Sequence, residues 1–301
     1  MSRESAAVEL EYGARARVVP IGATLRFIRR LVREPRGLIA MILLGTLAIF
    51  AFVVPLIDPV SPFDFLNVAA LAPPSGSHWF GTDELGRDLF IRNAVGLRTT
   101  VIAGVGAVCG GWLVGIGLGY FAGYSGGIVD STISRITDTM LAIPGIVVAI
   151  LLIALLGTGV WTISLSILIF NIPISVRLAR GAVLRELVRD YVLAAEAIGC
   201  SGRRVLYRHI VRNTFGVFAV QLPIAIVYSV LIMAALNYLG LGSKPPQPSL
   251  GDLMNQGQRY MQTDAWYLVT PVAVLVLLTL ALNFLSDVLA EMLDPIRRGR
   301  A

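Results

Sequence analysis

The stretch TMLAIPGIVVAILLIALLGTGVWTISLSILIFNIPISV, residues 139–176, runs for 38 positions without a charged side chain. As a single α-helix it would be about 57 Å long, nearly twice the roughly 30 Å thickness of a bilayer's hydrocarbon core. We therefore predict that it crosses a membrane twice and turns at the glycines of GTG, residues 157–159.

Other uncharged runs of this chain are each long enough for one membrane-spanning helix. Hydrophobic residues make up 56% of the 301 positions and charged residues 15%, and the mean hydropathy is +0.76, which is too apolar for the surface of a soluble domain. The runs are continuously apolar and do not alternate, which excludes a β-barrel. We predict an all-α membrane protein with six transmembrane helices, at about residues 38–57, 99–122, 136–157, 159–176, 213–239 and 265–286.

The distribution of basic residues predicts the orientation of these spans. With a cytoplasmic N-terminus, 20 of the 25 Lys and Arg residues fall inside, which satisfies the positive-inside rule and places both termini in the cytoplasm of a multi-pass inner-membrane protein. The first apolar run is too long for the core of a signal peptide. The predicted parts are a cytoplasmic tail with an interfacial helix (1–37), a transmembrane domain (38–301), an extracellular loop (58–97) and a cytoplasmic loop (177–212).

The residues that carry most enzyme and metal chemistry are few and far apart. Cys109 lies within a span and Cys200 inside, while His78 lies outside and His209 inside, so we expect no disulfide and no metal site. Lys244 is the chain's only lysine, and no phosphate-binding loop surrounds it. We predict no catalytic residue and no cofactor in this chain. The net charge of +6 fits topology and contact with membrane lipid better than nucleic-acid binding.

Ionisable residues within the spans are rare. Asp138 and Asp287 both lie near the cytoplasmic face, which disfavours an autonomous ion-coupled secondary transporter, although that remains the alternative function. Uncharged polar residues occur deeper in the spans and could either line a translocation path or form hydrogen bonds between helices. These candidates are Asn171, Gln221, Tyr228, Ser229 and Asn237.

The second span carries glycines at four-residue spacing, at Gly111, Gly115 and Gly119. Small residues with this period lie on one face of a helix and allow two helices to approach closely in lipid. The stripe predicts either close packing within the protein or a place where helices move against each other.

The stretch RDYVLAAEAIGCSGRRVLYRHIVRN, residues 189–213, is amphipathic, basic and interrupted by glycine. We predict a first helix from Ser175 to Ile198, a left-handed cap at Gly199 and a second helix that Ser201 caps and that runs to Val211. The cytoplasmic loop would then be a helix, a sharp turn and a helix.

The small side chains of Ala194 and Ala195 make the first helix thin, as a helix that enters a groove of a partner must be. We expect both alanines to face that partner. A loop that lies on lipid headgroups is the alternative, since the arginines would suit it too.

Several motifs, in order along the chain, resemble the second permease subunit of the ABC importers for dipeptides, oligopeptides and nickel. The segment YVLAAEAIG followed by RHIVRN resembles the EAA signature of such permeases. It departs from the signature in having Leu193 at the position of the glutamate and Arg212 at the position of the later proline. Further along the chain, Leu250 stands where an aromatic residue is common in the family. The other matching motifs are FGTDELGRD (80–88), DTMLAIPG (138–145), LGLGSKPPQPSLGDLM (239–254) and LDP (293–295).

The resemblance implies a type I ABC importer permease fold and a heteromeric complex. Its other members would be a second homologous permease, two ATPase subunits that bind ATP and magnesium, and an extracellular or periplasmic substrate-binding protein. Peptides are the solutes that it favours, with nickel, opines or sugars as alternatives. The residues expected to couple to the ATPases are Tyr191, Ala194, Ala195, Glu196, Gly199, Ser201, Arg203 and Arg204.

The extracellular loops would dock the binding protein. We expect the acids of GTDELGRD to form a polar, exposed surface for this contact, with a structural turn cluster, in which Asp83 caps a short helix, as the alternative. The docking candidates are Thr82, Asp83, Glu84, Arg87 and Asp88.

Overall fold

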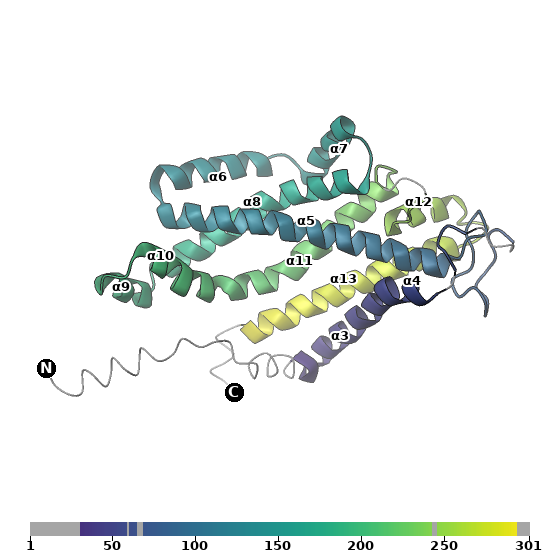
Figure 1. The fold of residues 1–301 in the computed structure, drawn as a ribbon, viewed down its shortest axis with the longest axis horizontal. Helices are drawn as coiled ribbons and strands as arrows, with labels where there is room; N and C mark the ends of the chain where they lie inside the picture. The colour runs from purple at the N-terminus through teal and green to yellow at the C-terminus, as the bar shows by residue number, and fades with distance from the viewer. Residues whose placement is uncertain (1–30, 59, 65–68, 243–245, 294–301) are drawn as a thin grey trace.

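The computed structural model describes residues 31–58, 60–64, 69–242 and 246–293, and these residues are almost entirely helical. Apart from an isolated bridge between Thr82 and Asp88, they contain no β-structure. The long helices run side by side along one axis, with α6 and α7 on one side of the bundle and α3 on the other (Figure 1). Their bounds are α3 Pro35–Ala48, α5 Leu89–Ser125, α6 Gly127–Leu141, α7 Gly145–Leu156, α8 Val160–Leu187, α11 Val211–Tyr238 and α13 Trp266–Leu293.

Shorter elements extend or connect these helices. The π-helical stretch η1 (Ile49–Val53) and α4 (Val54–Ile57) continue α3, while α10 (Gly202–Arg204) and the π-helical η2 (Val205–Ile210) lead directly into α11. Helix α9 (Asp190–Ala197) lies at one end of the bundle, and α12 (Leu250–Arg259) lies at the other (Figure 1). The start of α3 and the end of α13 lie toward the end that carries α9.

Within the part of the chain that the structure describes, five helices are long and apolar enough to cross a membrane, and there is a sixth candidate span if α6 and α7 count as one. The prediction of an all-α membrane protein is therefore confirmed, with five spans or, counting α6 and α7 together, the predicted six. The predicted tail and most of the interfacial helix lie outside the described residues, as do Lys244 and the end of LDP.

The third span differs from the straight helix predicted over 136–157. It consists of α6 and α7, which meet at an angle of 81°. Pro144, in extended backbone directly before α7, disfavours helical geometry in the residue that precedes it and cannot donate a hydrogen bond to continue α6.

Three other boundaries also differ from the prediction. Helix α5 begins at Leu89, ten residues before the predicted start at Thr99, because the carboxylate of Asp88 accepts hydrogen bonds from the backbone of its first turn. The predicted helix 175–198 is broken between Leu187 and Asp190 into α8 and α9. The second helix of the cytoplasmic loop does not end at Val211, because it continues as span five, Gly202–Tyr238.

Helices α5 and α8 form a close contact along the glycine stripe of α5. A Cβ atom on Gly111, Gly115 or Gly119 would lie 2.5 Å from a backbone carbonyl oxygen of α8. The hydroxyl of Ser175 fits into this contact, where it donates hydrogen bonds to Asn171 O and Ile172 O at 2.9 Å each. The stripe therefore serves close packing, which was one of its two predicted roles.

Replacing Gly115 with valine should separate α5 from α8. Its Cβ would lie 1.9 Å from Ser175 Oγ and 2.5 Å from Ile172 O, and such overpacking costs about 1–3 kcal/mol or more. We expect a lower melting temperature in detergent and a lower yield of assembled complex. Gly117→Val is the matched control, since a Cβ there meets nothing within 4 Å. Equal stability of the two variants would contradict this account.

Candidate functional site

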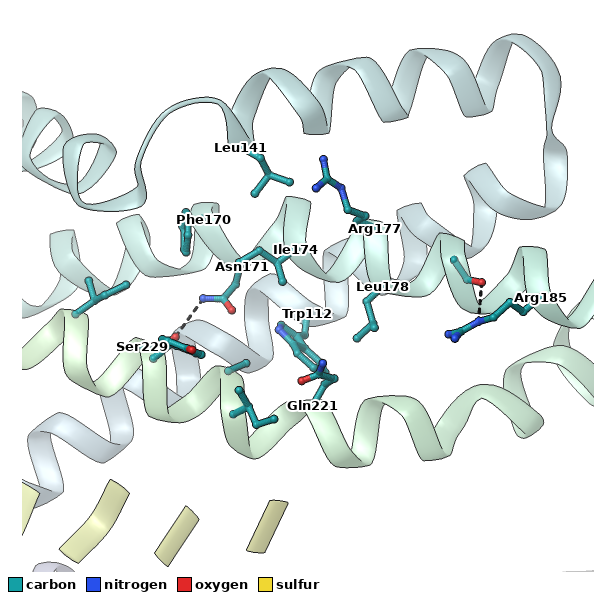
Figure 2. A pocket seen from close by; sticks show the side chains of 15 residues that line it. Trp112, Leu141, Phe170, Asn171, Ile174, Arg177, Leu178, Arg185, Gln221 and Ser229 are labelled. Carbon is teal, nitrogen blue, oxygen red and sulfur yellow. Dashed lines mark hydrogen bonds between the residues drawn. The ribbon is translucent and has the colours of Figure 1, made fainter. Parts of the chain in front are cut away.

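A cavity of about 770 Å³ opens between α8 and α11 (Figure 2). Its wall is largely apolar and includes Trp112, Phe170 and Leu178. Four of the five predicted path residues, Asn171, Gln221, Tyr228 and Ser229, also line it.

The polar groups of the cavity also link its two walls. Asn171 Nδ2 donates to Ser229 Oγ at 3.2 Å and to Ile167 O at 2.9 Å, so the amide joins α8 to α11 while it borders the cavity. Tyr228 also lines the cavity and is 64% exposed. Asn171 and Ser229 therefore border the cavity and also join two helices, while the role of these polar residues in a path stays a prediction.

Asn237 does not line this cavity, contrary to the prediction. It is buried near the far end of α11, where its Nδ2 donates to Met233 O at 2.7 Å. Gly242 and Gly251 pack so closely against it that an added Cβ would lie 1.9 Å and 2.7 Å from its side-chain atoms. Asn237 holds the loop after α11 against that helix.

Two arginines of the cavity were not among the predicted path residues. Arg177 and Arg185 line its wall on α8, and Gly181 lies between them on the same face. The signal in the sequence is the spacing of Arg177 and Arg185 by eight residues, which places both side chains on one face of a helix.

The predicted left-handed turn at Gly199 is confirmed. Gly199 has a φ of +81°, Cys200 N donates to Ala195 O at 3.0 Å, and Gly199 N donates to Glu196 O at 2.9 Å. This is the Schellman pattern of helix termination. The backbone carbonyl of Ser201 accepts hydrogen bonds at the start of the next helix, but its side chain does not form the predicted cap.

The turn is held by its own small hydrophobic core. Val183, Val192, Ala195, Val205 and Ile210 pack together, so α9 is fixed to the end of α8 and the start of span five. Ala195 is 7% exposed, which corrects the expectation that both alanines face a partner; Ala194 alone is exposed.

Four large apolar side chains of this element are exposed among its charged residues, which the sequence analysis missed. Val188 is 75% exposed, Leu193 54%, Ile198 81% and Tyr207 72%. Exposed apolar residues gathered at one end of a molecule indicate a contact surface. We call these four residues the tip surface.

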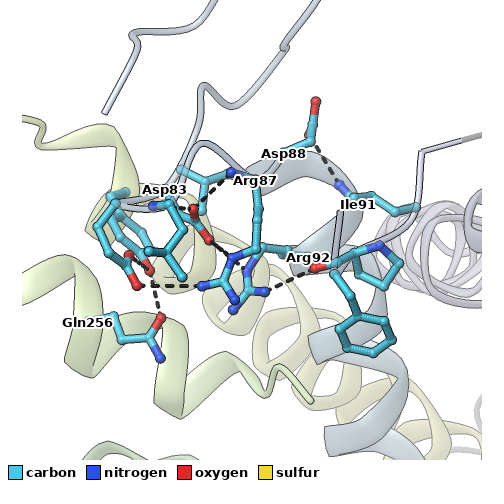
Figure 3. A network of polar contacts seen from close by, with 12 residues as sticks. Asp83, Arg87, Asp88, Ile91, Arg92 and Gln256 are labelled. Atoms are coloured by element: carbon cyan, nitrogen blue, oxygen red, sulfur yellow. Dashed lines mark hydrogen bonds and ion pairs between the residues drawn. The ribbon is translucent and has the colours of Figure 1, made fainter. Parts of the chain in front are cut away.

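At the other end of the molecule, the expected exposed acids are largely buried. The side chain of Asp83 is fully buried, and its Oδ2 lies 2.6 Å from Arg87 Nε and 3.1 Å from Arg92 Nε (Figure 3). Thr82 is buried as well, and its hydroxyl donates to Ala69 O at 2.8 Å. The expectation of an exposed acidic surface is therefore wrong for Asp83.

Asp88 is also mostly buried, because it caps α5 and contacts His78 Nδ1 at 2.8 Å. The structure thus supports the alternative of a structural turn cluster, although Asp88 and not Asp83 caps the helix. A role of these residues in docking stays a prediction.

Hydrogen bonds continue from these ion pairs into α12 and α13. Tyr267 OH donates to Glu84 Oε2 at 2.6 Å and contacts Gln256 Oε1 at 2.7 Å, while Gln256 Nε2 donates to Asp252 Oδ2 at 2.9 Å. Burial raises the pKa of Asp252, while Arg92 acts in the opposite direction. The loop before α5 is thereby joined to two helices far away in the sequence.

Residues 115–299 match the family model described as binding-protein-dependent transport system inner membrane component. The chain belongs to this family. It is 34% identical over 267 residues to the dipeptide transport system permease protein DppC of Alkalihalophilus pseudofirmus, covering 89% of this chain and 88% of the relative. It is 38% identical over 276 residues to the glutathione transport system permease protein GsiD of an Escherichia coli strain, covering 91% and 90%.

The fold of the permease is also found in a solved ABC transporter. A chain of the MetNI methionine ABC transporter, in an inward-facing conformation, superposes with a TM-score of 0.56 at 18% identity, covering 66% of this chain and 94% of that one. The predicted type I importer fold is confirmed. The chain is an inner-membrane permease subunit of an ABC importer, and the alternative of a secondary transporter is set aside.

Replacing Asp83 with alanine should destabilise the permease, because two buried arginines lose their shared carboxylate. Breaking a buried ion pair in this way costs about 3–5 kcal/mol. Yield and melting temperature of the purified complex measure the effect. Asp64→Ala, which removes an exposed carboxylate from the same loop, is the control. A stable Asp83→Ala complex that no longer responds to its binding protein would instead make Asp83 a direct docking residue.

Proposed function

We propose that this permease, paired with a second homologous permease, forms the path through which a peptide importer moves its substrate. The names of the relatives, which include dipeptide and glutathione permeases, support peptides as the solute class. The cavity between α8 and α11 is this chain's share of the path. Its apolar wall and few polar groups suit peptides of varied side chains.

The observation that carries this proposal is the connection between the cavity and the turn at Gly199. Helices α8 and α11 form the two main walls of the cavity, and the same two helices are joined by α9, Gly199 and α10. Because span five is continuous from Gly202 to Tyr238, a push on the turn would tilt a whole cavity wall. This is the geometry that mechanical coupling needs.

Two ATPase subunits would supply that push from the cytoplasm, with ATP and magnesium bound in them and not in this chain. We infer that the tip surface is their docking surface, with Ala194 and Glu196 beside it. Tyr191, Ala195, Gly199 and Ser201 would act by shaping the turn, and Arg203 and Arg204 are exposed at its second helix. The positive-inside rule puts this end and both termini in the cytoplasm.

A substrate-binding protein would dock at the opposite end, on the loop before α5 and on α12. Thr82, Asp83, Arg87 and Asp88 would hold the loop in shape, while exposed neighbours make the contact. Leu85 is 47% exposed and Trp79 65%, so apolar side chains contribute to this surface.

Placing a charge on the tip surface should release the ATPase subunits. Ile198→Asp changes an 81% exposed side chain, so the permease itself should fold normally, while burial of a carboxylate in the contact should weaken binding at least about tenfold. Co-purification stoichiometry and ATPase activity are the measurements.

Leu85→Asp is the matched control at the opposite end. We expect it to keep its ATPases and to lose stimulation by the binding protein. Normal ATPase stoichiometry and normal transport in Ile198→Asp would contradict the docking assignment. Loss of both partners from either variant would indicate a folding defect, which the melting temperature detects.

A further inference from the structure

The charged side chains that line the cavity between α8 and α11 are all positive. Among its fifteen lining residues are two arginines, Arg177 and Arg185, and no acid. The remaining polar groups are uncharged, and they include Asn171 and Gln221. In a cavity with low-dielectric walls, such an imbalance raises the local concentration of anions.

Arg177 has a carboxylate partner that a solute could replace. Its Nη2 donates to Asp138 Oδ1 at 2.6 Å, and both side chains are 62% exposed. Asp138 lies on α6 and does not line the cavity. Because exposed pairs of this kind are weak, the guanidinium can exchange Asp138 for another carboxylate at little cost.

Arg185 lies two turns further along α8, toward the end that carries α9. Its Nε donates to Gly181 O at 3.2 Å (Figure 2), and the structure shows no ion pair for it among the described residues. The two arginines therefore border the cavity in succession, and the second is not neutralised by an acid there.

We propose that Arg177 and Arg185 form a carboxylate-binding site of the translocation path, so that the permease favours solutes with an excess of carboxylates, such as peptides with an acidic side chain. This rests on the proposed function, in which the cavity is the path. A guanidinium offers paired donors that match a carboxylate's two oxygens. Asp138 competes for Arg177 and thereby allows the solute to leave.

Arginines also collect on the cytoplasmic side of membrane proteins for topology alone, and Arg135 separates the two explanations. It lies on α6, is exposed, and does not line the cavity. A general effect of positive charge would make Arg135→Gln resemble Arg185→Gln. A site in the cavity would distinguish them.

The potential of the cavity can be measured without knowledge of the solute. Gly181 lines the cavity, and a Cβ there meets nothing within 4 Å, so Gly181→Cys is accommodated. The experiment uses the assembled complex with Cys109 and Cys200 replaced by serine. The thiol of Gly181→Cys is allowed to react with a sulfonated and with a trimethylammonium methanethiosulfonate reagent, and the two reaction rates are compared with those of a free thiol in solution. We expect the anionic reagent to be favoured, and Arg185→Gln to lower this preference about threefold or more. No preference, or an equal loss with Arg135→Gln, would overturn the proposal.

Transport provides the second measurement. The complex with its ATPases and binding protein is reconstituted in vesicles, and uptake of Ala-Glu is compared with uptake of Ala-Gln. The Ala-Glu to Ala-Gln ratio should fall about threefold or more in Arg185→Gln and stay unchanged in Arg135→Gln. An unchanged ratio in Arg185→Gln would overturn the carboxylate site. Failure of both dipeptides to enter in wild type would count against the peptide assignment, and the thiol measurement would then decide the anion preference by itself.

Discussion

The contact between α5 and α8 is the interaction on which the functional parts of this permease depend. Because glycines of α5 lie against backbone carbonyls of α8, the two helices approach more closely than any side chain would allow. This fixes the axis of α8, and α8 in turn carries one wall of the cavity and the ion pairs to α6. Arg180 makes one of these pairs, with both oxygens of Asp130 at 2.5 and 2.7 Å. A small change in the α5–α8 contact would therefore alter the cavity and α6 together.

The sequence predicted the helical spans well because uncharged runs and glycine turns are local signals. It predicted the cap at Gly199 because only a left-handed residue ends a helix in that way. It failed where a distant partner decides the outcome. The sequence predicts an exposed carboxylate at Asp83, but in the fold Arg92 of the next helix lies beside it. It predicts an outward-facing Ala195, but in the fold Ala195 belongs to the same hydrophobic cluster as Val205.

Charge is used differently at the two ends of the molecule. At the end with α12, Asp83, Glu84 and Asp252 are gathered around Arg87 and Arg92, so each arginine has a carboxylate beside it and the loop is fixed. In the cavity, the arginines of α8 are exposed and carry only weak partners. The first arrangement favours a rigid loop, as a docking platform would require. The second allows an arginine to exchange one carboxylate partner for another, as a path for solutes would require.

The proposed coupling requires a stiff connection between the ATPases and the cavity, and the turn at Gly199 would provide one. A glycine turn on its own would bend under load, since glycine restricts the backbone little. Here the hydrophobic core of Val183, Val192, Val205 and their neighbours closes the turn, and Tyr191 OH donates to the carboxylate of Glu186 across the break between α8 and α9. The turn is therefore packed as one unit with the start of span five. A force on this turn would reach Ser229 in the cavity wall along span five, which begins at Gly202 directly after the turn.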